Sequence, residues 1–394
     1  MVDVDNDGDL DLYVCSGGNE FTEASSNLMD RLYVNDGNGN FTLSNQILPT
    51  FKFESGSCVR HADLDNDGDQ DLFVGIRNKP VYHGVPVNGY ILINDGKGNY
   101  SDQTKNRAPH LLNIGMITDA QWADMNNDHQ PDLIVCGEYM PIKIFYNNKG
   151  QFTDFKSISP NGWWNSILVT DLDNDTDLDI IGGNHGLNSR FKASAQHPIR
   201  LYINDFDQNG TVEQFLTSYR EGKEYPFSLK HDVITQIPSL KKKYLKYVSF
   251  AGQTIQDYFP SSVLSRSIID SANFLSSAVF IQEKGSFKMV ELPIEAQFSI
   301  VYATYSVDLD HDHLKEIILG GNQYRTKPET GRYDASYGLV IKQLPNHQFK
   351  SLSSEDSGVK IKGEIRDIKP IIINKKVHFI FARNNDYPLF YTMQ

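Results

Sequence analysis

The chain is built from short runs of apolar residues separated by clusters of Asp, Asn and Gly. One Asp-rich cluster recurs in similar form, starting at Asp3, Asp63, Asp124, Asp171 and Asp308. In DLDNDGDQDLFV, the copy from Asp63, the acidic residues lead directly into an apolar run that is typical of a β-strand. A sixth stretch, DFDQNGTVE from Asp205, has the same polar skeleton in a different local context. The pattern predicts repeated acidic loops between pairs of strands.

A second motif follows most of the acidic clusters. Apolar residues lead into Asn-Asp-Gly or Lys-Gly and then an aromatic residue at 32–41, 91–100 and 144–152, and in weaker form at 278–287. Asn, Asp and Gly tolerate the positive φ of tight turns, so each copy predicts a β-hairpin. One repeat therefore holds four strands, with the acidic loop between the first two.

Four strands per repeat predict an all-β fold, a β-propeller of four-stranded blades. We expect a single propeller over 1–394, with seven blades of which the first and the last are incomplete. The expected blades lie near 3–45, 58–104, 116–157, 165–220, 266–292, 298–350 and 361–394.

The stretch 229–262 breaks the strand pattern and predicts a small helical insertion. Its apolar positions are spaced by three or four residues, as on one face of a helix. They are Val233, Ile237, Leu240, Tyr244 and Tyr247. Pro238 is expected to open a second helix. Lys241, Lys242, Lys243 and Lys246 lie mostly off this stripe, so they predict a solvated face.

Composition narrows the class of protein further. The chain has 394 residues, of which 39% are hydrophobic, and no apolar run is long enough for a membrane-spanning helix. A net charge of −13 argues against a nucleic-acid partner. The three cysteines, Cys15, Cys58 and Cys136, are too few and too scattered for a disulfide framework and are predicted to be free thiols.

The acidic loops have the chemistry of a calcium site. Asp63, Asp65, Asp67 and Asp71 stand at loop positions 1, 3, 5 and 9, and position 7 can offer its backbone carbonyl. Clustered oxygen ligands suit Ca²⁺, and Gly68 at position 6 permits the sharp turn around an ion. The following residues predict a strand rather than the second helix of an EF-hand. Several structural Ca²⁺ ions are therefore the predicted cofactor.

The predicted ligand positions are the same in all six loops. They are Asp3, Asp5, Asp7, Asp9 and Asp11; Asp63, Asp65, Asp67, Asp69 and Asp71; Asp124, Asn126, Asp128, Gln130 and Asp132; Asp171, Asp173, Asp175, Asp177 and Asp179; Asp205, Asp207, Asn209, Thr211 and Glu213; and Asp308, Asp310, Asp312, Leu314 and Glu316.

The loops are not equivalent. Thr176, His129 and His313 replace the glycine at position 6, and a β-branched residue at positive φ is strained, so we expect a weaker site around Thr176. The alternative is that the loops are Asn/Asp/Gly-rich turns without metal. Periodic recurrence favours metal, and the oxygen-only ligand set disfavours Zn²⁺ and, because of the many protein oxygens, Mg²⁺.

Motifs of common enzymes are missing from the sequence. It has no HExxH, Walker, GxSxG or CxxC pattern. Trp163 and Trp164 can stack a sugar at a blade edge, although core or rim packing is the favoured reading. The polar, aromatic stretch around Arg332, Tyr333 and Asp334 is a candidate contact surface.

At the acidic loops the sequence resembles the FG-GAP/VCBS repeat family, whose members include the integrin α-chain propeller. In that family DxDxDGxxD loops join strands 1 and 2 of a blade and bind Ca²⁺. The match carries over to the loops starting at Asp3, Asp63 and Asp171, and in degraded form to those at Asp124 and Asp308.

A finer resemblance involves three stretches in the second half of the chain. LPIEAQFSIVYATYSVDLDHD, ETGRYDASYG and ARNNDYPLF are similar to the C-terminal part of Bacteroidetes envelope proteins with VCBS repeats and a cartilage-acidic-protein-like (ASPIC/UnbV) region. This resemblance implies export to the cell envelope or outside the cell. Because the chain starts inside a repeat and shows no signal peptide, we expect a C-terminal fragment of a longer protein or a truncated reading frame.

These observations predict a calcium-stabilised, non-catalytic binding or scaffold propeller with a protein or glycan ligand. One alternative is a lectin-like propeller that binds carbohydrate. Another is a propeller-fold polysaccharide lyase or glycosidase, which would require a His/Tyr/Arg or paired-carboxylate cluster at one mouth of the propeller.

Overall fold

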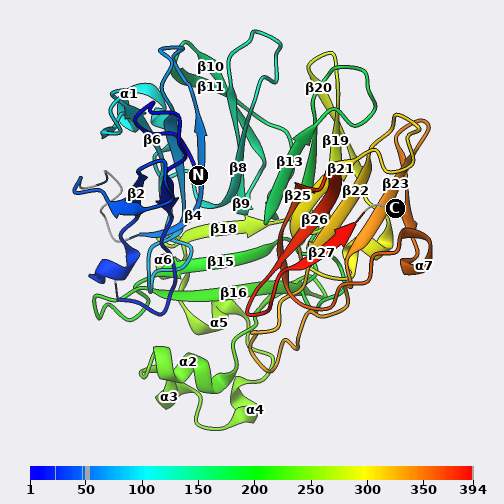
Figure 1. Cartoon of the computed structure of the whole chain (residues 1–394). Helices are drawn as coiled ribbons and strands as arrows, with labels where there is room; N and C mark the ends of the chain where they lie inside the picture. Colours follow the sequence, from blue (N-terminus) through cyan, green and yellow to red (C-terminus); the bar gives the residue numbers. More distant parts are fainter. Residues whose placement is uncertain (23, 47, 49–53, 393–394) are drawn as a thin grey trace.

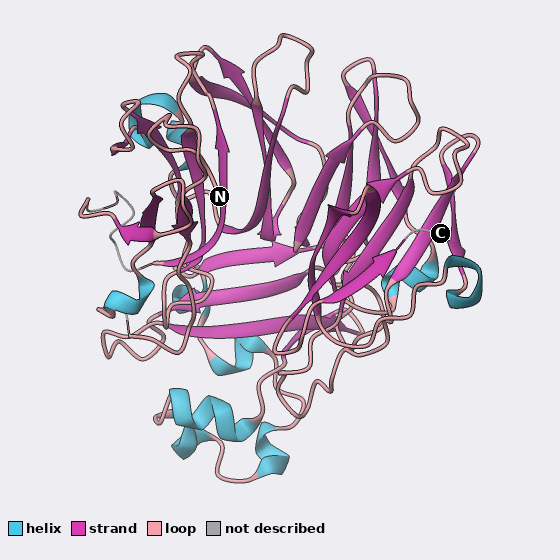
Figure 2. Cartoon of the chain, viewed as in Figure 1, coloured by secondary structure: helices cyan, strands magenta, loops and turns pink. Residues whose placement is uncertain are grey.

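The computed structural model describes residues 1–394 except 23, 47, 49–53 and 393–394. Most of the regular backbone in this part of the chain forms antiparallel sheets, and the helices are short (Figure 2). The fold is all-β with several four-stranded sheets, as in the predicted β-propeller.

Six sheets follow one another along the chain. The first contains β1 (Leu12–Val14), β2 (Arg31–Asn35) and β3 (Phe41–Leu43); the second contains β4 (Ser55–Ala62), β5 (Asp71–Asn78), β6 (Gly89–Asn94) and β7 (Tyr100–Asp102). The third contains β8 (Met116–Ala123), β9 (Asp132–Met140), β10 (Lys143–Asn148) and β11 (Gln151–Ser157), with β12 (Gly162–Trp163) added beside β9. The fourth contains β13 (Ser166–Thr170), β14 (Asp179–Gly183), β19 (Ala278–Glu283) and β20 (Ser286–Glu291). The fifth contains β21 (Val301–Val307), β22 (Glu316–Gly321), β23 (Leu339–Leu344) and β24 (Gln348–Leu352); the sixth contains β25 (Ile365–Ile373), β26 (Lys376–Arg383) and β27 (Leu389–Thr392).

The fourth sheet corrects two of the predicted blades. The prediction placed blades at 165–220 and 266–292, but β14 pairs with β19 in one sheet, with Ile180 opposite Phe280. Both side chains are fully buried beside Trp164, so packing holds the two distant strands together. The acidic stretch from Asp205 resembles the start of a further repeat, but it lies in an insertion between β14 and β19. The predicted count of seven blades is not confirmed.

The insertion forms a sheet of its own. It contains β15 (Ile199–Asn204), β16 (Glu213–Arg220), β17 (Lys223–Pro226) and β18 (Ile268–Ala272). Figure 1 shows this inserted sheet running across the ends of the neighbouring strands β8 and β13. Ile199, Ala272 and Leu275 of the insertion pack with Trp163 and Tyr139, which ties the insertion to the third sheet.

The helices of the insertion agree with the predicted stripe except at its end. Five helices follow β17: α2 (Lys230–Gln236), α3 (Leu240–Lys243), α4 (Tyr247–Phe250), α5 (Ile255–Tyr258) and α6 (Ser261–Leu264). Val233, Ile237, Leu240 and Tyr244 are buried, whereas Tyr247 is 69% exposed, because the chain leaves the helix after Lys243. The lysines of α3 are exposed, as predicted.

The remaining helical turns lie between strands. They are α1 (Thr104–Arg107) and α7 (Ser354–Ser357), with 3₁₀ turns at η1 (Ser26–Leu28), η2 (Pro109–Leu111) and η3 (Ile294–Gln297).

The first strands of neighbouring sheets contact each other in the order β4, β8, β13, β21, β25. A polar link joins three of them. The Arg60 guanidinium pairs with Asp119 Oδ1, and Arg60 Nε donates to the Ala120 carbonyl at 2.6 Å. The other Asp119 oxygen accepts the backbone N–H of Ile167 at 3.0 Å. Asp119 therefore connects β4, β8 and β13, and burial raises its pKa despite Arg60.

Removing this link should destabilise the protein. We expect Asp119→Ala to lower the free energy of unfolding by about 2–3 kcal/mol, because a charged partner of Arg60 and a buried acceptor are lost together. Urea unfolding measures the change. The control is Asp154→Ala on the exposed side of β11, which should change stability by less than about 0.5 kcal/mol. Similar losses for both variants would contradict a special role for Asp119.

Candidate metal centres

Except for the loop 205–212 of the inserted sheet, the acidic loops lie at one end of the sheets. Four of them join the first strand of a sheet to the second: 63–70 between β4 and β5, 124–131 between β8 and β9, 171–178 between β13 and β14, and 308–315 between β21 and β22. The loop 3–10 precedes β1, and 205–212 joins β15 to β16 in the inserted sheet. Position 2 is apolar in every loop and buried in five, at Val4, Leu64, Met125, Leu172 and Phe206, which anchors the loop on the core.

The backbone of each loop turns as the glycine pattern predicts. Position 6 has positive φ in all six loops, at 95° for Gly68 and 80° for Thr176. Thr176 is therefore a β-branched residue in the left-handed region, a strained arrangement. The first carboxylate closes the turn, since Asp63 Oδ2 accepts the N–H of Gly68 at 3.1 Å. Position 4, which the sequence argument overlooked, also has positive φ throughout, as at Asn66.

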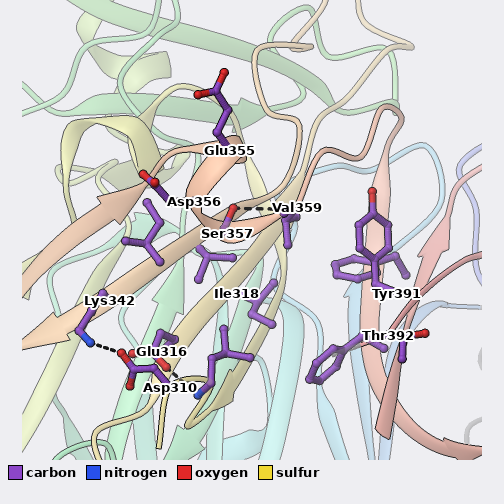
Figure 3. Close-up of a pocket in the computed structure, with 16 residues that line it drawn as sticks. Asp310, Glu316, Ile318, Lys342, Glu355, Asp356, Ser357, Val359, Tyr391 and Thr392 are labelled. Carbon is purple, nitrogen blue, oxygen red and sulfur yellow. Dashed lines mark hydrogen bonds and ion pairs between the residues drawn. The ribbon is translucent and has the colours of Figure 1, made fainter. Parts of the chain in front are cut away.

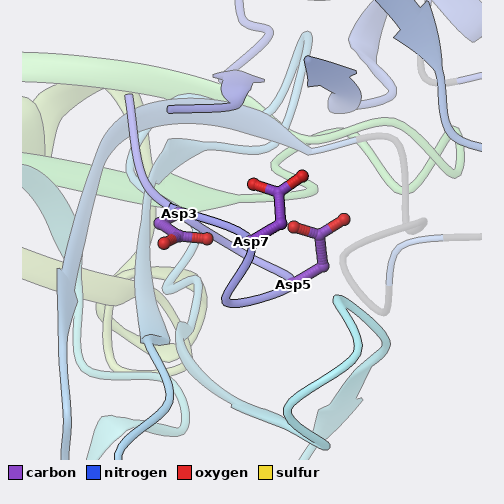
Figure 4. A group of neighbouring side chains, drawn as sticks. All are labelled: Asp3, Asp5 and Asp7. Carbon is purple, nitrogen blue, oxygen red and sulfur yellow. The ribbon is translucent and has the colours of Figure 1, made fainter. Parts of the chain in front are cut away.

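Acidic side chains converge in five of the six loops. In each, three carboxylates offer oxygens that all lie within 4.8 Å of one another. The groups are Asp3, Asp5 and Asp7; Asp63, Asp65 and Asp67; Asp171, Asp173 and Asp179; Asp205, Asp207 and Glu213; and Asp308, Asp310 and Glu316. Figure 4 shows the first group, with the three side chains gathered around one turn of the loop.

Buried oxygens in these loops lack hydrogen-bond partners among the described residues. They belong to Asp3, Asp5, Asp9, Asp65, Asp69, Asp173, Asp207, Asp308 and Glu316. Burial, together with the neighbouring Asp67, raises the pKa of Asp69 to about 6. An unpartnered buried polar atom is unfavourable, and a hard cation would satisfy several of these oxygens at once. The five clusters therefore fit a metal ion bound by oxygen.

The carboxylate at position 9 has a second role. Asp71 Oδ2 accepts the N–H of Leu64 at 3.2 Å, and Asp71 Oδ1 accepts the N–H of Asn94 at 2.8 Å. Asp11, Asp132 and Asp179 bind the equivalent two backbone groups in their sheets. This residue thus links the loop to a neighbouring strand of its own sheet, which is β2 in the first sheet and the third strand in the other three. Burial raises the pKa of Asp71 to about 7.

An amide side chain extends the connection to the preceding sheet. Asn94 Nδ2 donates to the Val4 carbonyl at 2.8 Å, and Asn147 Nδ2 donates to the Leu64 carbonyl at 3.0 Å. Gln282 Nε2 donates to the Met125 carbonyl at 3.1 Å. Each residue also gives its backbone N–H to the position-9 Asp of its own sheet, so successive acidic loops are joined. The sequence analysis interpreted these residues only as part of a hairpin turn, although Asn or Gln stands just before the turn in each motif.

The loop from Asp124 differs from the others. Among the described residues it brings no three acidic groups together and has no buried oxygen without a partner. Asn126 replaces an acid and donates to Asp128 Oδ2 at 3.0 Å. Hydrogen bonds within this loop therefore satisfy side-chain oxygens that, in the other five loops, a cation would satisfy.

The loop from Asp308 is partly neutralised by a lysine. Lys342 of β23 pairs with Asp310 and lies 3.0 Å from Asp312 Oδ2. Figure 3 shows Lys342 pointing to Asp310 at one end of a cavity of about 800 Å³ between the fifth and sixth sheets. The second loop also has a cationic neighbour, because Arg107 lies 2.7 Å from Asp65 Oδ2.

The candidate residues outside the acidic loops lie in different parts of the structure. Trp164 is fully buried in the core, as the favoured reading predicts, whereas Trp163 lines a cavity at the opposite end of the sheets. Tyr333 lines the same cavity, and the Arg332 guanidinium stacks on Tyr324 at 4.1 Å. The three cysteines are free.

Comparison with known families agrees with the loop geometry. The family model described as FG-GAP-like repeat matches residues 3–74 and 124–182. The chain therefore carries FG-GAP-like repeats, as the resemblance of its loops indicates, whereas the finer resemblance to ASPIC/UnbV proteins is not confirmed. A comparison with curated proteins finds no match.

Two solved structures are similar over most of the chain, at low scores. The crystal structure of the V. cholerae biofilm matrix protein Bap1 has a TM-score of 0.39 and 9% identity, covering 100% of this chain and 76% of that chain. A structure of BBS1N in complex with ARL6DN has a TM-score of 0.34 and 11% identity, covering 98% of this chain and 97% of that chain. At these scores neither likeness supports an inference about this protein.

Within the described residues, no helix is long and apolar enough to cross a membrane.

The difference between the loop from Asp63 and the loop from Asp124 predicts which mutation costs more Ca²⁺-dependent stability. Asp67→Ala removes a carboxylate from a converging group, and Asp128→Ala removes one from the loop that Asn126 already stabilises. Because a stronger site couples more binding energy to folding, Asp67→Ala should lose more of the Ca²⁺-dependent stability. Thermal melts at matched free Ca²⁺, with EDTA controls, measure both. A larger loss for Asp128→Ala would reverse the ranking.

The connection between loops predicts a second effect. Asn147→Ala removes the side-chain donor to the Leu64 carbonyl and the acceptor for the Gly150 N–H at 2.7 Å. We expect the free energy of unfolding to fall by about 1–3 kcal/mol, as for buried groups left unpaired. The neighbouring Asn148 is exposed, so Asn148→Ala is the matched control in the same denaturant titration. Equal losses of unfolding free energy in the two variants would show that the buried Asn147 amide does not contribute to stability.

Proposed function

We propose that this protein is a calcium-stabilised, non-catalytic binding or scaffold propeller. The observation that carries the proposal is the convergence of carboxylates in five loops, with buried oxygens that no protein group satisfies. The repeated sites act on the fold rather than on a substrate, because they lie at the turns that join the first two strands of a sheet. FG-GAP-like repeats fit such a binding or scaffold role.

Calcium is the cation that the donor set favours. The converging groups consist of Asp and Glu alone, without Cys or His. Ca²⁺ accepts six to eight oxygens in irregular geometry, whereas Mg²⁺ requires a stricter octahedron and keeps its waters. Sites of the extracellular type bind Ca²⁺ at about 10⁻⁴–10⁻³ M, so they would fill outside a cell rather than in the cytosol. FG-GAP-like repeats are typical of extracellular proteins, which supports placement in an exported or cell-envelope protein.

A carbohydrate ligand is the second candidate. It is favoured by an aromatic, polar cavity at the end of the sheets opposite the acidic loops. That cavity also holds the His/Tyr/Arg cluster that a polysaccharide lyase would require, with Glu138 as its one lining carboxylate. A glycosidase with two carboxylates is therefore less well supported there.

Removing the metal should destabilise the whole fold. At ten times Kd each filled site contributes roughly 1.4 kcal/mol by mass action, so several sites rival a total stability of about 5–15 kcal/mol. We expect EDTA to lower the thermal midpoint cooperatively and Ca²⁺ to restore it. Mg²⁺ at the same concentration is the control and should restore less. Coincident midpoints with and without EDTA would refute the metal assignment.

A further inference from the structure

A cavity of about 470 Å³ lies at the end of the sheets opposite the acidic loops. Its volume falls within the range of about 300–1,000 Å³ that is common for small-molecule sites. Arg77 comes from the end of β5, Glu138 from the end of β9, and Tyr302 from the start of β21. Loops after β14 and β22 supply His185 and Tyr333. Five separate segments therefore converge on one opening.

One wall of the cavity is aromatic. The Trp163 ring meets His185 edge-on at 5.0 Å and Phe191 at 5.2 Å between ring centroids. His185 in turn meets Tyr333 at 5.2 Å. These edge-to-face contacts hold the rings in fixed orientations.

Four polar groups at the cavity lack hydrogen-bond partners among the described residues, and one of them is the Trp163 indole N–H. His185 Nε2 and the Tyr333 hydroxyl are buried without a hydrogen bond, and each residue is only 8% exposed. Glu138 Oε1 accepts from Arg77 at 2.6 Å, but Glu138 Oε2 is buried and unpartnered. Since such groups are unfavourable when left unsatisfied, their gathering at one cavity indicates a ligand that supplies donors and acceptors.

The charge of the cavity disfavours a strongly anionic ligand. Arg77 is already paired with Glu138, and burial lowers the pKa of His185 to about 4, so this ring is neutral near pH 7. Lys327 is mostly exposed and lies 3.8 Å from Asp232. The free acceptor is a carboxylate oxygen, which would repel an anion and attract a hydroxyl donor.

We propose that this cavity binds a neutral saccharide unit. The hydroxyls of a neutral sugar can donate to Glu138 and exchange hydrogen bonds with His185 and Tyr333, while its apolar face packs on the aromatic wall. The proposal deepens the binding role proposed above by giving it a site and a ligand class. It does not depend on the metal, because no residue of the six acidic loops lines the cavity.

Tyr333→Phe tests the proposal with little structural disturbance. Its hydroxyl has no partner in the protein, so the thermal midpoint should stay unchanged, but the Kd for a bound sugar should rise about tenfold. The probes are glucose, galactose, mannose, fucose and N-acetylglucosamine, measured by saturation-transfer difference NMR in Ca²⁺. Tyr337→Phe is the matched control, because Tyr337 is 46% exposed and does not line the cavity.

Binding of at least one neutral sugar, weakened by Tyr333→Phe and not by Tyr337→Phe, supports the proposal. It is overturned if none of these sugars binds, if Tyr333→Phe binds as tightly as the wild type, or if only glucuronic acid or inorganic phosphate binds. Cleavage of a polysaccharide that contains the bound sugar would likewise replace the binding role by an enzymatic one. Failure here leaves the EDTA result standing, so the two proposals are tested separately.

Discussion

The carboxylate at position 9 of each acidic loop is the group on which the arrangement most depends. In four sheets it accepts one backbone N–H from its own loop and one from an Asn or Gln on a neighbouring strand, which is β2 in the first sheet and the third strand in the other three. Because that amide residue reaches back to the preceding loop, a disturbance in one loop is passed to its neighbour through buried hydrogen bonds. Such bonds are strong at low dielectric and unfavourable to leave broken. The acidic clusters and the packing of the sheets are therefore coupled at the same residues.

The local parts of this fold could be predicted from the sequence, and the long-range parts could not. Acidic loops, hairpins and the positive φ at position 6 follow from residues close together in the chain, and the structure places them as expected. The pairing of β14 with β19 could not be predicted in this way, because the stretch that begins at Asp205 looks like one more repeat. Only the packing of Ile180 against Phe280 distinguishes an insertion from the next blade.

The same division applies to the sites. The predicted ligand positions rest on the spacing of carboxylates, and the structure brings three carboxylates together in each of five loops. The roles of Asn94, Asn147 and Gln282 were hidden, because a residue before a turn carries no sign of the carbonyl that it will reach in another sheet. The opposite cavity was hidden for a similar reason. Trp163 and Tyr333 were noted separately, and only the fold brings them to the same wall as His185.

The inserted sheet has a consequence for the order of folding. The fourth sheet cannot be completed until β19 reaches β14, and the chain between them is a long loop if it is unstructured. Closing such a loop costs conformational entropy, and contacts distant in sequence slow folding. If β15 to β18 form first, with Asn204 opposite Glu213 and Ile199 opposite Ala272, the two ends of the insertion are already held near each other. A folded insertion lowers the entropy cost of bringing β19 to β14. The stability of the insertion therefore determines how readily the fourth sheet forms.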